Sequence, residues 1–175
     1  NPTHYPASTE HWDKVDEATS DGDTTYVAEA AAGVWYRDLY NLPSPSFSSA
    51  CAINSITVKT VTKVYDVTCS IGNGMSIKTG GTIYEMDGGW EETAYTEHSN
   101  TWTSNPKTGV AWTWADIDAL QIGPRCNVGG ANCWWRCTQV WVEIDYTPLT
   151  ASDSGVGVDA VVGLVITSSD TGAGV

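Results

Sequence analysis

Every second residue from Val140 to Tyr146 is apolar, and this pattern constrains the fold more than any other stretch of the chain. The apolar parity consists of Val140, Val142, Ile144 and Tyr146. A period of two residues belongs to a β-strand with one buried face, because successive side chains of a strand point to opposite sides. We therefore expect a strand here, and we expect it to be the last strand of a folded domain.

Other segments extend the β pattern. Residues 53–71 predict a long strand whose apolar parity changes near Thr60, and a bulge there would restore one buried face. The sequence Gly-Asn-Gly at 72–74 predicts a hairpin turn. A second turn is predicted at 87–89, where Gly follows Asp.

One short helix is predicted, with Thr113 as its N-cap and Asp116 three residues later. Trp114, Ile117 and Leu120 follow at a spacing of three and share one helix face. Short strands separated by turns, together with a single helix, predict an all-β fold. We expect an antiparallel β-sandwich of jelly-roll type with one short helix and a C-terminal strand tail.

The chain divides into an N-terminal extension (1–10), a β-sandwich domain (11–146) and a C-terminal tail (147–175), with a hinge at Thr147–Pro148. The tail contains a strand pattern that is apolar on both faces, as in a fully buried strand. Its apolar residues are Val158, Val161, Val162, Leu164, Val165 and Ile166. The sequence pattern of the domain ends before this strand begins, so we expect the strand to pair with another copy of the chain.

Charge excludes one class of partner. Acidic residues number 21 against 8 basic residues, and the formal net charge is −13. Nucleic acid binding needs a basic surface, so we expect none. No apolar run reaches the length of a membrane span, so we expect no membrane-spanning segment.

No pattern of a nucleophilic enzyme is present. The chain has three His residues and lacks a Gly-x-Ser-x-Gly sequence. The pair Glu91–Glu92 follows a Gly-rich turn, where a solvated charge pair is the simpler interpretation. We therefore expect a protein that is not an enzyme.

Four carboxylates fall within one short segment and make a candidate structural calcium site, the only cofactor that we consider. They are Asp16, Glu17, Asp21 and Asp23. Calcium binds several hard oxygen ligands, which this segment could supply. The alternative is a polar Asp-Gly turn without a metal.

The five Cys residues favour disulfides over zinc, because no paired Cys-x-x-Cys spacing occurs. Disulfides indicate an oxidising compartment. We expect one bond within the cluster Cys126, Cys133 and Cys137, either Cys126–Cys137 or Cys126–Cys133. A bond between Cys51 and Cys69 requires the chain to fold back on itself.

The adjacent Trp134 and Trp135 are candidates for contact with a glycan or a partner protein. In a strand only one of the two could be exposed, whereas in a loop both could stack on sugar rings. The alternative is one core Trp and one Trp that covers a sheet edge.

Three segments resemble β-sandwich, jelly-roll-like domains of surface, filament and virion or tail proteins of prokaryotes and their viruses. The segments are 11–27, 101–123 and 137–146. The resemblance implies a structural or adhesive module. Residues 126–137, rich in Cys and Trp, depart from the pattern.

These observations predict a structural subunit of an extracellular filament or virion appendage. It would assemble head-to-tail by inserting a terminal β-strand into a neighbouring subunit, and its partner would be a second copy of itself. The alternative is a carbohydrate-binding or adhesion module that recognises a cell-surface or environmental polysaccharide through exposed Trp residues.

Overall fold

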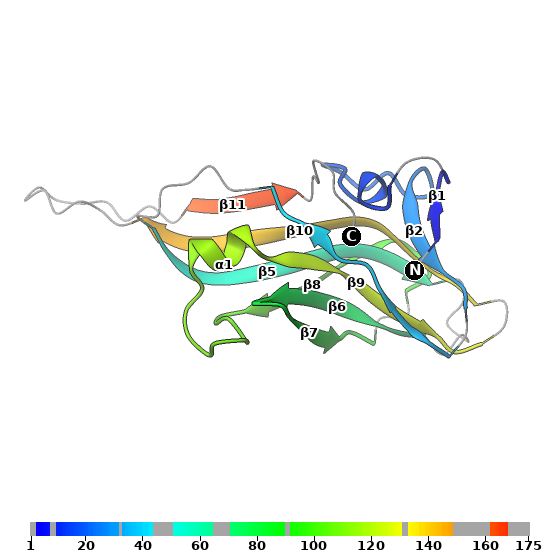
Figure 1. Ribbon diagram of the computed structural model, residues 1–175. Coiled ribbons are helices and arrows are strands. Elements are labelled where there is room, and N and C mark those ends of the chain that lie inside the picture. Colours follow the sequence, from blue (N-terminus) through cyan, green and yellow to red (C-terminus); the bar gives the residue numbers. More distant parts are fainter. Residues whose placement is uncertain are drawn as a thin grey trace, which may run out of the picture.

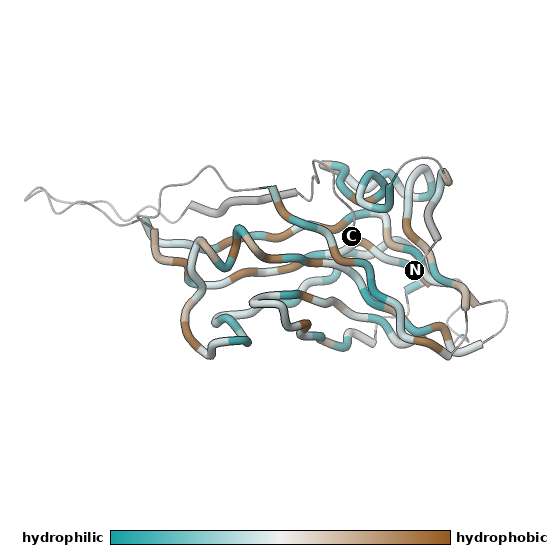
Figure 2. Tube along the Cα trace, in the orientation of Figure 1, coloured by the Kyte–Doolittle hydropathy of each residue, from teal (hydrophilic) through white to brown (hydrophobic). Residues whose placement is uncertain are grey.

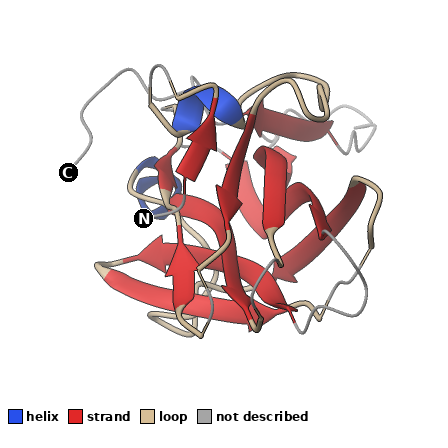
Figure 3. Ribbon diagram, turned by 90° about the vertical axis from the view of Figure 1, so that its right-hand side faces the viewer, coloured by secondary structure: helices blue, strands red, loops and turns tan. Residues whose placement is uncertain are grey.

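The computed structural model describes residues 3–7, 10–31, 33–43, 51–64, 71–89, 92–130, 133–148 and 162–167. Within them the fold is all-β, with two antiparallel sheets and two short helical segments (Figure 3). The helical segments are a 3₁₀ turn at Trp12–Lys14 and the helix α1 at Trp114–Asp118. The all-β expectation is therefore confirmed.

The first sheet, sheet A, is built around two long antiparallel strands, β5 and β10. Along the sheet its strands are β1 (Thr3–Tyr5), β2 (Tyr26–Glu29), β10 (Trp135–Pro148), β5 (Cys51–Val64) and β8 (Thr96–Trp102). A further strand, β11 (Val162–Thr167), pairs with β10 (Figure 1).

The second sheet, sheet B, has shorter strands. Its order is β3 (Trp35–Arg37), β9 (Gln121–Val128), β6 (Ile71–Thr79) and β7 (Thr82–Asp87), and β4 (Tyr40–Asn41) also pairs with β9. Gly80 and Gly81, both at positive φ, make the turn between β6 and β7. A residue with a side chain would be strained at either position.

One hydrophobic core contains residues from both sheets. Sheet A contributes Ile56, Val58, Val142 and Ile144, and sheet B contributes Met75, Ile77 and Ile122, all at most 1% exposed. Apolar residues recur along the long strands (Figure 2). The alternation expected for 138–146 is confirmed in its apolar half, since Val140, Val142, Ile144 and Tyr146 are all buried.

The predicted helix is also confirmed, including its cap. The Thr113 side chain accepts a hydrogen bond from the Asp116 backbone N–H (3.1 Å), and the Asp116 carboxylate accepts one from the Thr113 N–H (2.9 Å). Trp114 of α1 donates its indole N–H to the Cys51 carbonyl and packs edge-on against Tyr146. The helix therefore lies at the end of β10 that is next to the start of β11.

Two expectations about β5 and β6 differ from the structure. The β5–β10 register shifts at two other places, between Cys137 and Gln139 and between Asp145 and Tyr146, and Thr60 is buried. Residues 72–74 lie inside β6 rather than in a hairpin. Glycine at position 74 allows the backbone of β7 to approach closely, since a Cβ there would stand 2.0 Å from the Met86 carbonyl oxygen.

The ends of the domain also differ from expectation. Thr147 and Pro148 continue β10 opposite Ala52 and Cys51, so they do not form a hinge. The expected N-terminal extension contributes β1, which pairs with β2. Backbone pairing does not require apolar alternation, so the sequence pattern does not indicate either pairing.

Candidate functional site

Three segments in turn lie along the edge of β10 that faces away from β5. β2 pairs with residues 135–137. The N-terminal segment follows, where the Val15 carbonyl accepts a hydrogen bond from the Val140 N–H (2.9 Å) and the Glu17 carbonyl accepts one from the Gln139 side chain (2.7 Å). β11 then pairs with residues 141–146. This edge is the candidate assembly site.

The register of β11 places alternate residues opposite buried positions of β10. Val162, Leu164 and Ile166 lie opposite Tyr146, Ile144 and Val142, all of which are buried. Gly163, Val165 and Thr167 lie opposite Asp145, Glu143 and Trp141. Val162, Leu164 and Ile166 therefore share one side of β11, and Gly163, Val165 and Thr167 share the other.

The expectation that this strand has no partner within its own chain is wrong, because it pairs with β10 of the same chain. β2 pairs with only the first residues of β10, so most of that edge of β10 is left for another strand. This gap follows from the strand register, which the sequence alone does not give. Val158 and Val161, also expected in the strand, lie outside the described residues.

The N-terminal segment explains where the pairing of β11 stops. Thr167 is opposite Trp141, and the next position of β10, Val140, already bonds to Val15. Figure 1 shows the β11 arrow directed toward the N-terminal coil. A strand added at this edge is therefore bounded at one end by Val15 and near the other by α1.

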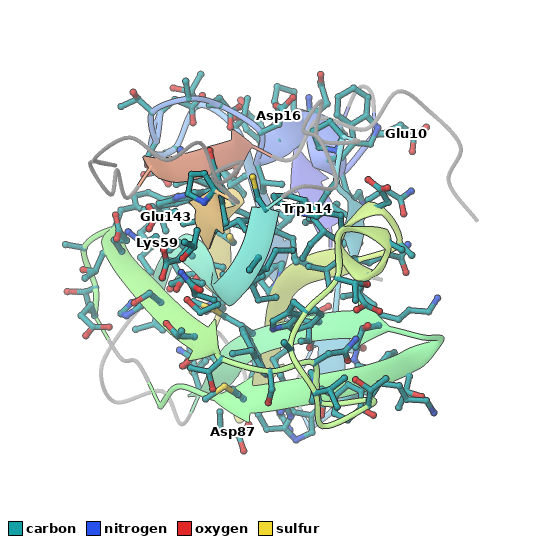
Figure 4. The ribbon with its side chains drawn as sticks, turned by 90° about the vertical axis from the view of Figure 1, so that its left-hand side faces the viewer. Glu10, Asp16, Lys59, Asp87, Trp114 and Glu143 are labelled. Atoms are coloured by element: carbon teal, nitrogen blue, oxygen red, sulfur yellow. The ribbon has the colours of Figure 1, made fainter. Side chains whose placement is uncertain are left out.

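A shallow depression of about 370 Å³ lies beside the end of the β10–β11 pairing at Trp141. It is lined by Ala18, Thr19, Ser20, Val61, Glu97, Gln139 and Trp141. Nearby, Lys59 forms ion pairs with Glu97 (3.1 Å) and Glu143 (2.9 Å). Figure 4 shows Lys59 and Glu143 next to each other, with Asp87 at the lower edge of the view.

Trp134 and Trp135 have different environments. Trp135 is 1% exposed in the core, so its expected contact with a glycan or partner is wrong. Trp134 is half-buried, with the Arg136 guanidinium 4.1 Å and the Lys63 ammonium 5.5 Å from its ring. Trp135 begins β10 and Trp134 precedes it, so the alternation of the strand turns one ring inward.

The cations beside Trp134 are part of a larger cluster, which we call the Asp23 cluster. Asp23 accepts hydrogen bonds from Lys63 (2.8 Å), Arg136 (2.6 Å) and the Tyr95 hydroxyl (2.9 Å). The bond from Lys63 is the main cause that lowers the pKa of Asp23 to about 2. Arg136 also stacks on Tyr26, and Lys63 on Tyr95. These residues come from distant segments, so nothing in the linear sequence indicates that they meet.

The four carboxylates expected to bind calcium do not converge. Asp23 bonds to cations in the Asp23 cluster, whereas Glu17 and Asp21 both contact the Thr25 hydroxyl. Thr138 also donates to Asp21 (3.0 Å). No group of three or more His, Cys, Asp or Glu in the described part of the chain is arranged to hold a metal ion.

Glu17 and Asp21 share the Thr25 hydroxyl, and this arrangement favours a proton on one of the two carboxyl groups. A hydroxyl has a single hydrogen, so Thr25 cannot donate to both acids at once. Burial raises the pKa of Glu17, the bond from Thr25 partly offsets this, and the charges of Asp21 and Asp16 raise it further. A proton on Glu17 lets Thr25 donate to Asp21 while it accepts from Glu17.

We expect this pair to make the stability of the protein depend on pH. The folded protein binds the Glu17 proton more tightly than the unfolded chain, so the free energy of unfolding falls as pH rises above about 4.5, the ordinary value for Glu. The variant Glu17→Gln should flatten this fall between pH 4.5 and 7 in denaturant unfolding measurements. Glu97→Gln is the matched control, and an unchanged slope in Glu17→Gln would contradict the assignment.

The disulfide expectations are wrong in their pairings. Cys133 is disulfide-bonded, whereas Cys51, Cys126 and Cys137 are free thiols. Cys69 lies outside the described residues. Neither bond of Cys126 forms, nor does Cys51–Cys69. Cys126 and Cys137 lie within β9 and β10 of different sheets, and only Cys133 is in the connection between them.

Comparison with known proteins adds no assignment. No family model matches the chain, and no curated protein or solved structure is significantly similar to it. The resemblance to surface and tail proteins therefore stays a prediction. Among the described residues, no helix is long and apolar enough to cross a membrane.

Proposed function

We propose that this chain is a structural subunit of an extracellular filament or virion appendage, built on a jelly-roll-type β-sandwich. Subunits assemble head-to-tail when β11 of one copy enters the β10 edge of the next. The observation that carries the proposal is the pairing of β11 over six consecutive residues of β10, an edge position that ends at Val15.

Exchange between copies keeps the same contacts. A β11 strand from a neighbour meets the same β10 residues in the same register as the strand of the same chain, so little pairing energy is lost. Residues 149–161 connect β10 to β11, and a connection of this length can reach a second copy. Each copy offers one strand and one acceptor edge, so a non-reciprocal exchange has no fixed end and gives a filament.

One further observation supports the extracellular location, and another bears on the unassembled subunit. Cys133 is disulfide-bonded, and disulfides persist mainly in oxidising compartments. The net charge of −13 keeps unassembled subunits apart and soluble.

Engineered disulfides test which copy donates the strand. Asp145 and Gly163 are opposite each other in the register, so the double variant Asp145→Cys/Gly163→Cys should form a disulfide across the pair. Cys51 is replaced by Ala in this background, because it lies near the end of β10. Cys126 and Cys137 can stay, since burial raises the pKa of both thiols, that of Cys137 to about 12.

Non-reducing electrophoresis of the assembled protein then gives the result. Strand exchange predicts a ladder of covalent multimers, and exchange between two copies only predicts dimers. The matched control is Asp145→Cys/Thr167→Cys, whose two positions are four residues out of register and should not crosslink. Crosslinked monomers alone, from a sample that imaging shows to be filamentous, would contradict donation by β11.

A further inference from the structure

Trp35 lies on the outer face of sheet B, and its side chain is 41% exposed. It belongs to the edge strand β3, where it is opposite Asn127 of β9. Its neighbour Tyr36 points the other way and packs against the core. The Trp35 ring therefore belongs to the face of sheet B that does not contact sheet A.

Two residues of neighbouring strands contact this ring. The Arg125 guanidinium carbon lies 3.7 Å from the ring centroid, which is a stacking distance. Gly72 of β6 lies under the outer part of the ring, and a Cβ at that position would stand 2.7 Å from Cη2 of Trp35. The indole consequently reaches across β9 toward Gly72, with Arg125 against one of its faces and 41% of the side chain exposed.

Arg125 is itself fixed. Its side chain is 9% exposed, and its Nη1 bonds to Asp87 (2.8 Å) and Glu85 (3.2 Å) of β7. Arg37 contacts Glu85 from the other side. The ring thus rests on a buried guanidinium held by two carboxylates, and side chains with both hydrogen-bond donors and acceptors surround it.

We propose that Trp35 is the platform of a binding site for a neutral polysaccharide, with the apolar face of one sugar ring stacked on the indole. Glu85, Asp87 and Arg37 surround this platform and offer hydrogen bonds to sugar hydroxyl groups. Arg37 and Arg125 neutralise the two carboxylates at the site, and the net charge of −13 of the chain disfavours an anionic polysaccharide.

A protein partner fits this surface less well. Energetically important Trp residues in protein interfaces usually fill pockets that exclude water, whereas Trp35 lies open on a flat sheet. The Trp pair expected to bind sugar is less suitable, because Trp135 is buried and Trp134 has Arg136 and Lys63 against its ring. The platform is on sheet B and the assembly edge is on sheet A, so this inference does not depend on the proposed assembly.

Binding isotherms of the full chain on insoluble cellulose, chitin, xylan and mannan test the proposal. We expect the protein to bind at least one of the four. Trp35→Ala should weaken that binding about tenfold or more, as for the loss of one dominant aromatic contact. Gly72→Ala should weaken it roughly threefold or more, because the new methyl group lifts a movable ring without touching the core.

The controls separate the platform from other aromatic residues and from folding. Trp134→Ala and Val34→Ala, the latter removing an exposed apolar neighbour of Trp35, should bind within about twofold of the original protein. The melting temperature of each variant is measured to show that it is folded. All variants are compared in the same assembly state, since multivalent filaments bind more tightly than single subunits. The proposal is wrong if none of the four polysaccharides is bound, if Trp35→Ala or Gly72→Ala binds normally, or if Trp134→Ala abolishes binding.

Discussion

Replacing Gly123 by Ala is expected to destabilise the protein by roughly 3–5 kcal/mol, among the largest effects of a single methyl group. Gly123 lies in β9, and a Cβ there would stand 1.7 Å from the Asp38 carbonyl oxygen and 2.8 Å from its carbon. The obstacle is backbone rather than a movable side chain, so the segment between β3 and β4 must separate from β9. Urea unfolding measures the loss as a lower midpoint with an unchanged slope.

Gly130→Ala is the matched control for this experiment. Its nearest neighbour would be Cys133 Sγ at 3.5 Å, an ordinary contact. We expect a change within about 1 kcal/mol, mostly from the lower entropy of the unfolded chain. If Gly123→Ala were as mild as Gly130→Ala, the close crossing of β9 by residues 38–39 would be incorrect.

The sequence predicts local features of this fold well where one segment contains the whole signal. The strand at 138–146 and the Thr113–Asp116 cap are both correct, because alternation and capping involve residues close together in the chain. The turn predicted at 72–74 is wrong for a physical reason. Glycine there makes room for Trp35 and the Met86 carbonyl, and both come from other strands.

The candidate sites depend almost entirely on long-range contacts. Trp35 gains its support from Arg125 and Gly72, which belong to two other strands. The carboxylates near residue 20 predicted a metal site, but Lys63 and Arg136 approach Asp23 from β5 and β10. Sequence spacing cannot report such approaches, because register and strand order decide them.

Removing the tail after Pro148 is expected to abolish assembly. The core residues of both sheets precede this point, so the shortened chain should still fold. It loses the β11 pairing, which lowers the free energy of unfolding by roughly 3 kcal/mol or more at about 0.5–1.5 kcal/mol per ladder hydrogen bond. Size-exclusion chromatography and electron microscopy should then show monomers at concentrations where the full chain forms filaments.

A synthetic peptide spanning residues 158–167 should restore the missing strand to the shortened chain. We expect binding of one peptide per subunit, recovery of the lost stability and no recovery of filaments, because the peptide is not attached to a second subunit. The matched control peptide carries Leu164→Asp, which puts a charge opposite the buried Ile144 and should not bind. Filaments of the shortened chain alone would exclude β11 as the donor. Equal binding of the two peptides would show that the β10 edge does not bind the strand in a defined register.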